Sequence, residues 1–136
     1  MITHIDHTAD DGFEVISDSS EHMFLEAGHE MLNMLYSPKK VKNREERTIE
    51  INSPFFDMLF HNFLAELLQI AQYDKFLIKK IEILKLTQNE MIFKVFGENY
   101  NTKCHEYHIE IKAVTYHMLE AEEQNGKWFG KVIFDL

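Results

Sequence analysis

Residues 110–119 read Glu-Ile-Lys-Ala-Val-Thr-Tyr-His-Met-Leu, and the rest of the sequence can be arranged around this stretch. Apolar residues at positions 107, 109, 111 and 113 alternate with polar ones, which is the period-two pattern of a strand with one buried face. From Val114 onward the apolar residues occupy the parity that was polar before. A strand that changes its buried face midway is either bulged or covered on both sides. The pattern therefore predicts a strand over residues 104–119 near the middle of a sheet, with Lys112 held on a rigid element.

The segments around this stretch predict an α+β order of elements. Apolar residues at helical spacing predict helices over residues 20–36 and 54–72, the second starting from a Ser53 cap and Pro54. Strands are expected at 13–16, 48–51, 76–86, 91–96 and 128–134. Hairpin turns are expected at Gln88-Asn89, Gly97-Glu98-Asn99 and Asn125-Gly126. Strand–helix pairs followed by a run of strands are typical of the α+β class.

Length and composition indicate one ordinary globular domain. The chain has 136 residues, so a single domain over residues 1–136 is expected. One cysteine, Cys104, excludes an internal disulfide and a Cys-rich zinc site. The first residues lack the apolar core of a signal peptide, so a cytoplasmic location is expected. The 54–72 helix is interrupted too often for a membrane span, by polar residues at positions 57, 61, 62, 66 and 69. Its wet side is predicted to follow Asp57, His61, Ala65, Gln69 and Gln72.

The charge balance disfavours direct nucleic-acid binding. The formal net charge is −9, and the chain stays anionic even with all eight histidines protonated. Its lysines and arginines are scattered, and the densest basic run, residues 39–42, is offset by Glu45 and Glu46. Phosphate backbones repel such a chain unless basic residues gather in a patch. Cations or a basic protein surface are the expected partners.

Two acidic places are candidates for a metal site. The first is the turn His7-Thr8-Ala9-Asp10-Asp11-Gly12, although local capping of backbone N–H groups also explains aspartates in a turn. The second is the C-terminus, where an apolar strand runs almost to Asp135 and the terminal carboxylate of Leu136. Clustered hard oxygens suit Mg²⁺ or Ca²⁺. The alternative is that both carboxylates point into water.

Lys112 is the remaining candidate, and two interpretations of it are open. It lies two residues from Glu110 on one predicted strand face, so the pair is either a structural ion pair or a site with a functional lysine. A phosphate-binding glycine loop, a nucleophile elbow and a dinucleotide fingerprint are all absent from the sequence. The residues alone therefore indicate an acidic α+β domain with a candidate cation site and no nucleophile.

At these residues the chain resembles the archease family. Four pieces match in order and spacing: residues 6–10 (Asp-His-Thr-Ala-Asp), residues 59–67 of the second helix, residues 110–117 (Glu-Ile-Lys-Ala-Val-Thr-Tyr-His) and residues 132–136 (Val-Ile-Phe-Asp-Leu). Asp11 departs from the family pattern, which usually has a small apolar residue there. That change would enlarge the acidic site or shift its metal preference.

The resemblance implies a function, a fold and a set of site residues. Archeases are accessory proteins of the RtcB-type RNA ligase, which uses GTP and manganese to join RNA 3′-phosphate or cyclic-phosphate ends to 5′-hydroxyl ends, as in tRNA splicing. The helper promotes guanylylation of the ligase and multiple turnover. The family fold pairs a mostly antiparallel sheet with two helices in strand–helix–strand–strand units. The family's metal site maps onto Asp10 and Asp135 with the C-terminal Leu136, and its functional lysine maps onto Lys112.

The interpretation that follows is a non-enzymatic activator that carries a divalent cation (Ca²⁺, Mg²⁺ or Mn²⁺) and docks on the ligase. An acidic helper suits a partner whose RNA-binding surface is basic. Two alternatives stay open: a metal-dependent hydrolase that uses the same carboxylates to activate water, and a metal-free, chaperone-like interaction module.

Overall fold

The computed structural model of the protein describes residues 1–6 and 10–136, and the motif residues His7, Thr8 and Ala9 lie outside the described residues. Along the chain the elements are β1 (Ile2–Asp6), β2 (Asp10–Ser17), α1 (Ser20–Leu35), the 3₁₀ turn η1 (Pro38–Lys40), β3 (Glu45–Asn52), α2 (Phe56–Leu68), the π-helical turn η2 (Gln69–Tyr73), β4 (Phe76–Leu86), β5 (Glu90–Asn99), β6 (Ala113–Val114), β7 (Glu120–Gln124) and β8 (Lys127–Asp135).

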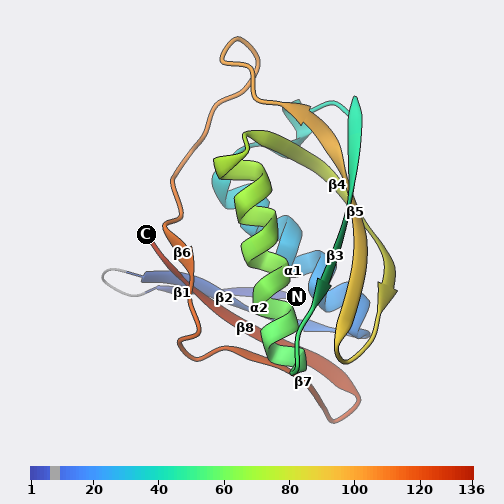
Figure 1. Ribbon diagram of the computed structural model, residues 1–136. Coiled ribbons are helices and arrows are strands. Elements are labelled where there is room, and N and C mark those ends of the chain that lie inside the picture. Colours follow the sequence, from blue (N-terminus) through green and yellow to red (C-terminus); the bar gives the residue numbers. More distant parts are fainter. Residues whose placement is uncertain (7–9) are drawn as a thin grey trace.

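Two antiparallel sheets and two helices build the fold (Figure 1). In the first sheet, termed the β8 sheet, the strand order is β1-β2-β8, and β6 and β7 both pair with the far edge of β8. The second, termed the β5 sheet, has the order β3-β5-β4. Helix α1 contacts β2, β8 and β4, and α2 contacts β6, β7 and β3. The predicted α+β class with mostly antiparallel strands is confirmed.

An aromatic core joins the helices to both sheets. The Phe24 ring of α1 lies 5.2 Å from that of Phe60 and 5.4 Å from that of Phe63, both on α2. Phe63 in turn meets Phe93 of the β5 sheet at 5.0 Å between ring centroids. All four side chains are fully buried, so each contributes on the order of 2–3 kcal/mol of hydrophobic stabilisation. The same two helices contact the other sheet, α1 at β2 and β8 and α2 at β6.

The helices begin at different kinds of residue. Helix α1 starts as predicted, with the Ser19 hydroxyl accepting a hydrogen bond from the His22 N–H at 3.1 Å. The prediction that Ser53 caps the second helix is wrong, since α2 begins at Phe56. The Ser53 N–H instead donates to the Asn89 carbonyl, which extends the β3–β5 ladder by one residue. Ser53 therefore ends a strand rather than starting a helix.

The predicted central strand over residues 104–119 is also wrong. Residues 100–112, termed the strap, have no regular secondary structure, and only Ala113–Val114 pair with β8, at the edge of its sheet. The alternation holds in part, because Ile111 is fully buried and Lys112 is exposed, but Ile109 and Ala113 are also exposed. Any extended segment lying on a core alternates in this way, whatever supplies its backbone hydrogen bonds. In the strap, side chains supply many of them.

Two of the three predicted hairpin turns are confirmed. Gln88-Asn89 joins β4 to β5, and Asn125-Gly126 joins β7 to β8 with φ values of 52° and 81°, as a type I′ turn requires. The third prediction is wrong, because residues 97–99 continue β5 and pair with β4. The sequence also missed β1 and β7, which are short and rich in polar residues, a common design for edge strands.

Within the described residues, no helix is both long and apolar enough to cross a membrane.

Candidate metal and partner site at the strand ends

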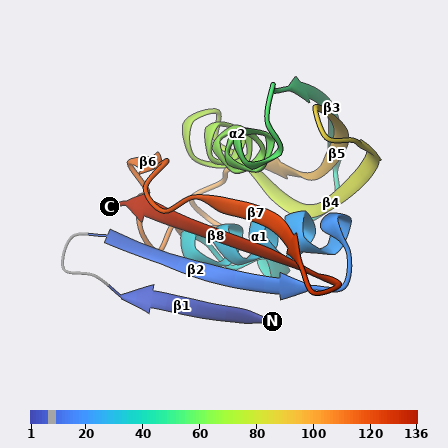
Figure 2. The ribbon, with the colours of Figure 1, turned by 90° about the horizontal axis from the view of Figure 1, so that it is seen from below.

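Three strand ends meet where the two acidic sequence motifs come together. Asp135, the last residue of β8, has Asp10 of β2 as its Cα partner on one side and Ala113 of β6 on the other. The Lys112 N–H donates to the Asp135 carbonyl at 2.8 Å. We term Asp10, Lys112, Asp135 and Leu136 the three-strand tip. Figure 2 shows the C-terminal end of β8 lying between β2 and β6.

Residues next to the tip hold β2 and β8 in this register. The Phe13 and Phe134 rings, one from each strand, pack at 5.6 Å between centroids in the core. Gly12 allows the two backbones to approach, because a Cβ atom there would lie 2.3 Å from the Val132 carbonyl oxygen. The glycine and the aromatic pair thus explain why residues about 125 positions apart share one place.

The described side chains of the tip are open to solvent. Asp135 and Lys112 are exposed, and Leu136 is 40% exposed. In the part of the chain that the structure describes, no ion pair joins Lys112 to Glu110 or to another carboxylate. The structural ion pair with Glu110 is therefore not formed. Lys112 presents a cation whose backbone is fixed and whose side chain is available.

Asp11 occupies a different position from Asp135. Its partner in the register is Phe134, whose side chain is buried, so Asp11 lies on the core-facing side of the sheet. Its Oδ1 accepts a hydrogen bond from the Gly12 N–H at 2.8 Å. The side chain of Asp10 lies outside the described part of the chain. The side chain of Asp11 therefore bonds to the backbone of its own strand.

The donor types at the tip suit a hard divalent cation. Asp135 and the carboxylate of Leu136 offer oxygen ligands on adjacent residues, and oxygen is what Mg²⁺, Ca²⁺ and Mn²⁺ prefer. Among the side chains that the structure describes, no three His, Cys, Asp or Glu residues are grouped to hold a metal. A complete ligand set at the tip would therefore also need Asp10, whose backbone lies beside Asp135.

The π-helical turn η2 fixes the strap just before Lys112. The Gln72 side chain makes two bonds to Ile111: its Oε1 accepts from the backbone N–H at 2.9 Å, and its Nε2 donates to the carbonyl at 2.8 Å. This amide pair imitates a neighbouring strand. The Tyr73 hydroxyl lies 3.4 Å from the Lys112 carbonyl. π-Helical turns are frequent at functional sites, and this one positions the lysine backbone.

Part of the helix side predicted to be wet instead contacts the strap and β6, through Gln72 and His61, whereas Gln69 is exposed as predicted. His61 is buried, its Nε2 donates to the Val114 carbonyl at 2.7 Å, and its ring stacks on Tyr116 at 4.0 Å between centroids. The prediction that His61 lies on a solvated face is wrong for this reason. The polar residues spaced along α2 were the only indication of these contacts in the sequence. They mark groups that form hydrogen bonds, and not all of them are exposed.

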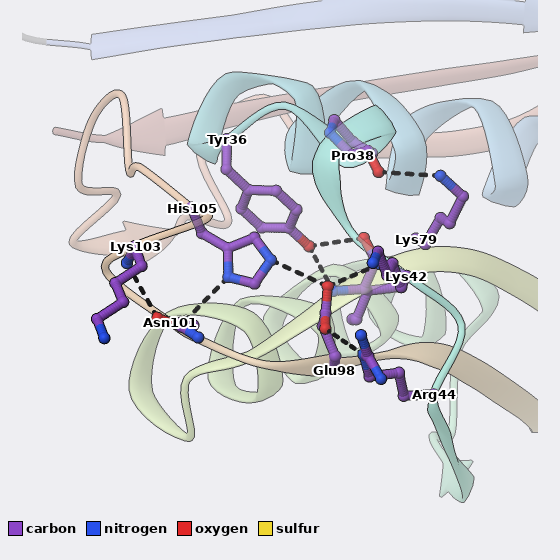
Figure 3. A network of polar contacts seen from close by, with 10 residues as sticks. Tyr36, Pro38, Lys42, Arg44, Lys79, Glu98, Asn101, Lys103 and His105 are labelled. Atoms are coloured by element: carbon purple, nitrogen blue, oxygen red, sulfur yellow. Dashed lines mark hydrogen bonds and ion pairs between the residues drawn. The ribbon is translucent and has the colours of Figure 1, made fainter.

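The far end of the strap is fastened by charged groups (Figure 3). The Asn101 N–H donates to His105 Nδ1 at 2.9 Å, so the proton on Nε2 is directed to Glu98, 3.0 Å away. Burial favours a raised pKa for Glu98, but bonds from the Lys42 N–H, His105 and Arg44 outweigh it and lower the pKa below its ordinary value. His105 is itself buried, so this network holds the strap against β5.

Comparisons with known proteins agree with the fold and the motifs. The family model described as the Archease protein family (MTH1598/TM1083) matches residues 3–136. The protein archease of Methanosarcina mazei is 31% identical over 98% of this chain and 94% of its own length. That of Methanopyrus kandleri is 32% identical over 97% of this chain and 96% of its own length.

Solved structures are similar along the whole chain. The solution structure of protein 1598 of Methanobacterium thermoautotrophicum has a TM-score of 0.81 and 31% identity, and it covers 99% of this chain and 98% of its own. The crystal structure of an archease from Thermotoga maritima, described as a possible chaperone, has a TM-score of 0.69, with 100% and 98% coverage. At 24% identity the second similarity supports the fold alone.

Proposed function

The chain belongs to the archease family, and from that premise we propose that it is an accessory protein of an RtcB-type RNA ligase and not itself an enzyme. It promotes guanylylation of the ligase and multiple turnover, as in tRNA splicing, and it acts in the cytoplasm. The observation that carries this proposal is the three-strand tip. There the register brings the backbones of Asp10 and Asp135 together, and the Lys112 N–H bonds to Asp135.

In this proposal the tip holds one divalent cation. Asp10, Asp135 and the carboxylate of Leu136 are its ligands, and Ca²⁺, Mg²⁺ and Mn²⁺ all suit their oxygens. When bound, the cation supplies positive charge for an anionic group of the ligase or its nucleotide. Asp11 is not a ligand, because it lies on the other face of β2.

Lys112 is the residue of the tip that faces the partner. Its backbone N–H is held by the Asp135 carbonyl, the Tyr73 hydroxyl lies 3.4 Å from its own carbonyl, and Gln72 fixes the preceding residue, Ile111. The exposed ammonium group is thus presented at a defined place without an ion-pair partner in the described residues. A fixed cation that is free of other partners can bind a phosphate or a carboxylate of the ligase.

The surface around the tip supports a protein partner rather than RNA. Large aromatic side chains are exposed there, with Tyr73, whose hydroxyl lies 3.4 Å from the Lys112 carbonyl, at 53% and Tyr116, two residues after β6, at 61%. Aromatic residues and methionine are enriched in protein interfaces. The net charge of −9 opposes direct contact with a phosphate backbone. The ligase, rather than its RNA, is therefore the proposed contact.

Guanylylation of a purified RtcB-type ligase, followed with labelled GTP, tests the proposal. We expect the wild-type protein to stimulate the reaction and Lys112→Ala to lose at least tenfold of that stimulation. Lys103→Ala is the matched control, because Lys103 is an exposed lysine at the other end of the strap.

Three results would contradict the proposal. Full stimulation by Lys112→Ala would show that this lysine is not needed for the contact with the ligase. Turnover of RNA or GTP without any ligase would favour a hydrolase. Full stimulation by Asp10→Asn and Asp135→Asn, measured at the same manganese concentration as the wild type, would favour a chaperone-like module that needs no cation of its own.

A further inference from the structure

The β5 sheet has a long free edge along β3. Ser53 and Asn89 form a hydrogen-bonded pair of the β3–β5 ladder, with Ser53 N–H donating to the Asn89 carbonyl. In an antiparallel ladder every second residue is hydrogen-bonded to the neighbouring strand, so Ile51 and Ile49 also bond to β5. The residues between them direct their N–H and C=O groups away from β5: Glu46, Thr48, Glu50 and Asn52. No described backbone group pairs with these.

The other free edge of this sheet is protected, and the contrast is informative. Along β4 the register shifts twice, between Ile78 and Lys80 and between Ile83 and Lys85. The Tyr36 hydroxyl accepts from the Ile78 N–H at 2.6 Å and donates to the Ile78 carbonyl at 2.8 Å, in place of a strand. Bulges, lysines and covering groups are the usual defences of an edge. The β3 edge has an unbroken register over eight residues without a bulge, and its charged residues are mostly acidic: Glu45, Glu46, Arg47 and Glu50.

Helix α2 runs beside β3 (Figures 1 and 2). An open groove lies between this edge and α2. Its volume is about 400 Å³, and it is lined by Ile51, Asn52, Asn62, Ala65, Glu66 and Gln69. The half-buried Ile51 gives it an apolar floor, while the amides of Asn62 and Gln69 give it hydrogen-bonding walls. Such a groove accepts an extended chain whose backbone pairs with β3.

The charges on the groove select its occupant. Glu50 is exposed on the outer face of β3, as is Glu46, whose Oε1 lies 3.6 Å from Lys94 Nζ, and Glu66 lines the groove on the inner side. In an antiparallel pair of two copies centred on Thr48, Glu46 of one copy would face Glu50 of the second, and directly opposed like charges destabilise a sheet. Self-pairing in this register is therefore disfavoured. Lysine or arginine side chains on an added strand would meet these carboxylates favourably.

We propose that the β3 edge is a docking site for an extended, basic segment of a partner protein, which adds to the β5 sheet as a fourth strand. Main-chain bonds to Thr48 and Glu50 supply affinity, and the surrounding glutamates supply the preference for basic residues. This inference is independent of the proposed function, because it uses neither the three-strand tip nor a cation.

Selection from a phage-displayed library of random twelve-residue peptides, with the complete protein as bait, tests this site. We expect enriched peptides that alternate lysine or arginine with β-branched residues. A selected peptide should slow amide hydrogen exchange at Thr48 and Glu50 by at least tenfold. Ile49 and Ile51, already paired with β5, should change little.

Thr48→Pro removes one outward N–H without removing a β3–β5 bond, and prolines are tolerated at strand edges. We expect it to weaken peptide binding at least tenfold, whereas Thr48→Val should bind normally. Glu50→Lys with Glu66→Lys provides a second test that keeps the backbone intact and should reverse the charge preference.

Four outcomes would overturn the proposal. These are no enriched peptide, enriched peptides that are acidic, unchanged binding by both the Thr48→Pro and the double-lysine variants, and protection of Thr48 and Glu50 by self-association without peptide.

Discussion

The two ends of the strap are fastened by different chemistry. At the end near β5, the contacts involve ionisable groups, with His105 and Arg44 bonded to Glu98. At the end near the three-strand tip, the contacts are neutral, with the Gln72 amide bonded to Ile111 and the Lys112 N–H bonded to a carbonyl. Charged contacts weaken with acid or salt, whereas neutral ones do not. The tip should therefore stay in place under conditions that loosen the other end.

This difference bears on function because Lys112 lies at the neutral end. A lysine that must meet a partner gains from a backbone whose position does not depend on pH or ionic strength. The charged end lies 7 to 14 residues earlier in the chain, beside Lys103 and Cys104, which the proposed function does not use. Substitutions can remove the contacts at each end of the strap separately.

The largest effect is expected from Gln72→Ala. Both backbone groups of the fully buried Ile111 would lose their hydrogen-bond partner, which should lower the free energy of unfolding by about 2–3 kcal/mol. Urea denaturation measures the loss, and amide hydrogen exchange at Ile111 shows where it occurs. Gln69→Ala is the matched control, because Gln69 is exposed and bonds only to Asp74 at 3.2 Å. Equal losses from both variants would contradict the role of Gln72.

A smaller and pH-dependent effect is expected from Glu98→Gln. The pKa of Glu98 is lowered from an ordinary value of 4.5, so its contribution to stability is complete above that pH. The contribution is lost as the pH falls through the lower, folded-state pKa. At pH 7 the free energy of unfolding of the variant should be about 1–1.5 kcal/mol lower than that of the wild type, because a charged hydrogen-bond acceptor is gone.

Denaturation curves at several pH values between 7 and 3 check this expectation. The difference between wild type and Glu98→Gln should shrink below pH 4.5. Glu110→Gln serves as the control, since Glu110 is exposed on the neutral half of the strap. A difference that is constant with pH would mean that the charge of Glu98 does not fasten the strap.

The smallest effect on stability is expected from Lys112→Ala. The side chain is exposed, and within the described residues it forms no ion pair, so its removal should change the free energy of unfolding by under about 0.5 kcal/mol. Thermal unfolding of the variant measures this directly. A decrease in the free energy of unfolding above about 1 kcal/mol would show that Lys112 stabilises the fold. Any loss of ligase stimulation by the variant would then be explained by its lower stability.

The sequence predicted those elements whose causes are local. Helical spacing identified both helices, and the turn residues Asn125 and Gly126 identified the β7–β8 hairpin, because each signal lies within a few residues. The strap was mistaken for a strand since its main bonds come from Gln72, 39 residues away. Nothing in the alternation of residues 107–113 distinguishes a neighbouring strand from a glutamine side chain.

In the candidate site, too, the sequence predicted only what depends on local features. The acidic residues at both ends of the chain could be named as candidate cation ligands from their chemistry, and the resemblance to a family added Lys112 as a candidate. The roles of Gln72 and His61 could not be found, because both residues appeared to be ordinary polar positions on a solvated helix face. Only the packing of α2 against the strap and β6 reveals their bonds to Ile111 and Val114.

The most direct test of the account is calorimetric titration of Ca²⁺, Mg²⁺ and Mn²⁺ into the wild type, Asp10→Asn and Asp135→Asn. We expect one cation per wild-type chain, at least a tenfold loss of affinity in each variant, and metal-free variants no less stable than the wild type. The physical reason is that gathered carboxylates repel one another until a cation neutralises them. Asp11→Asn should bind as the wild type does. If the wild type binds none of the three cations, or if both variants bind them as well as the wild type, the cation site at the three-strand tip does not exist.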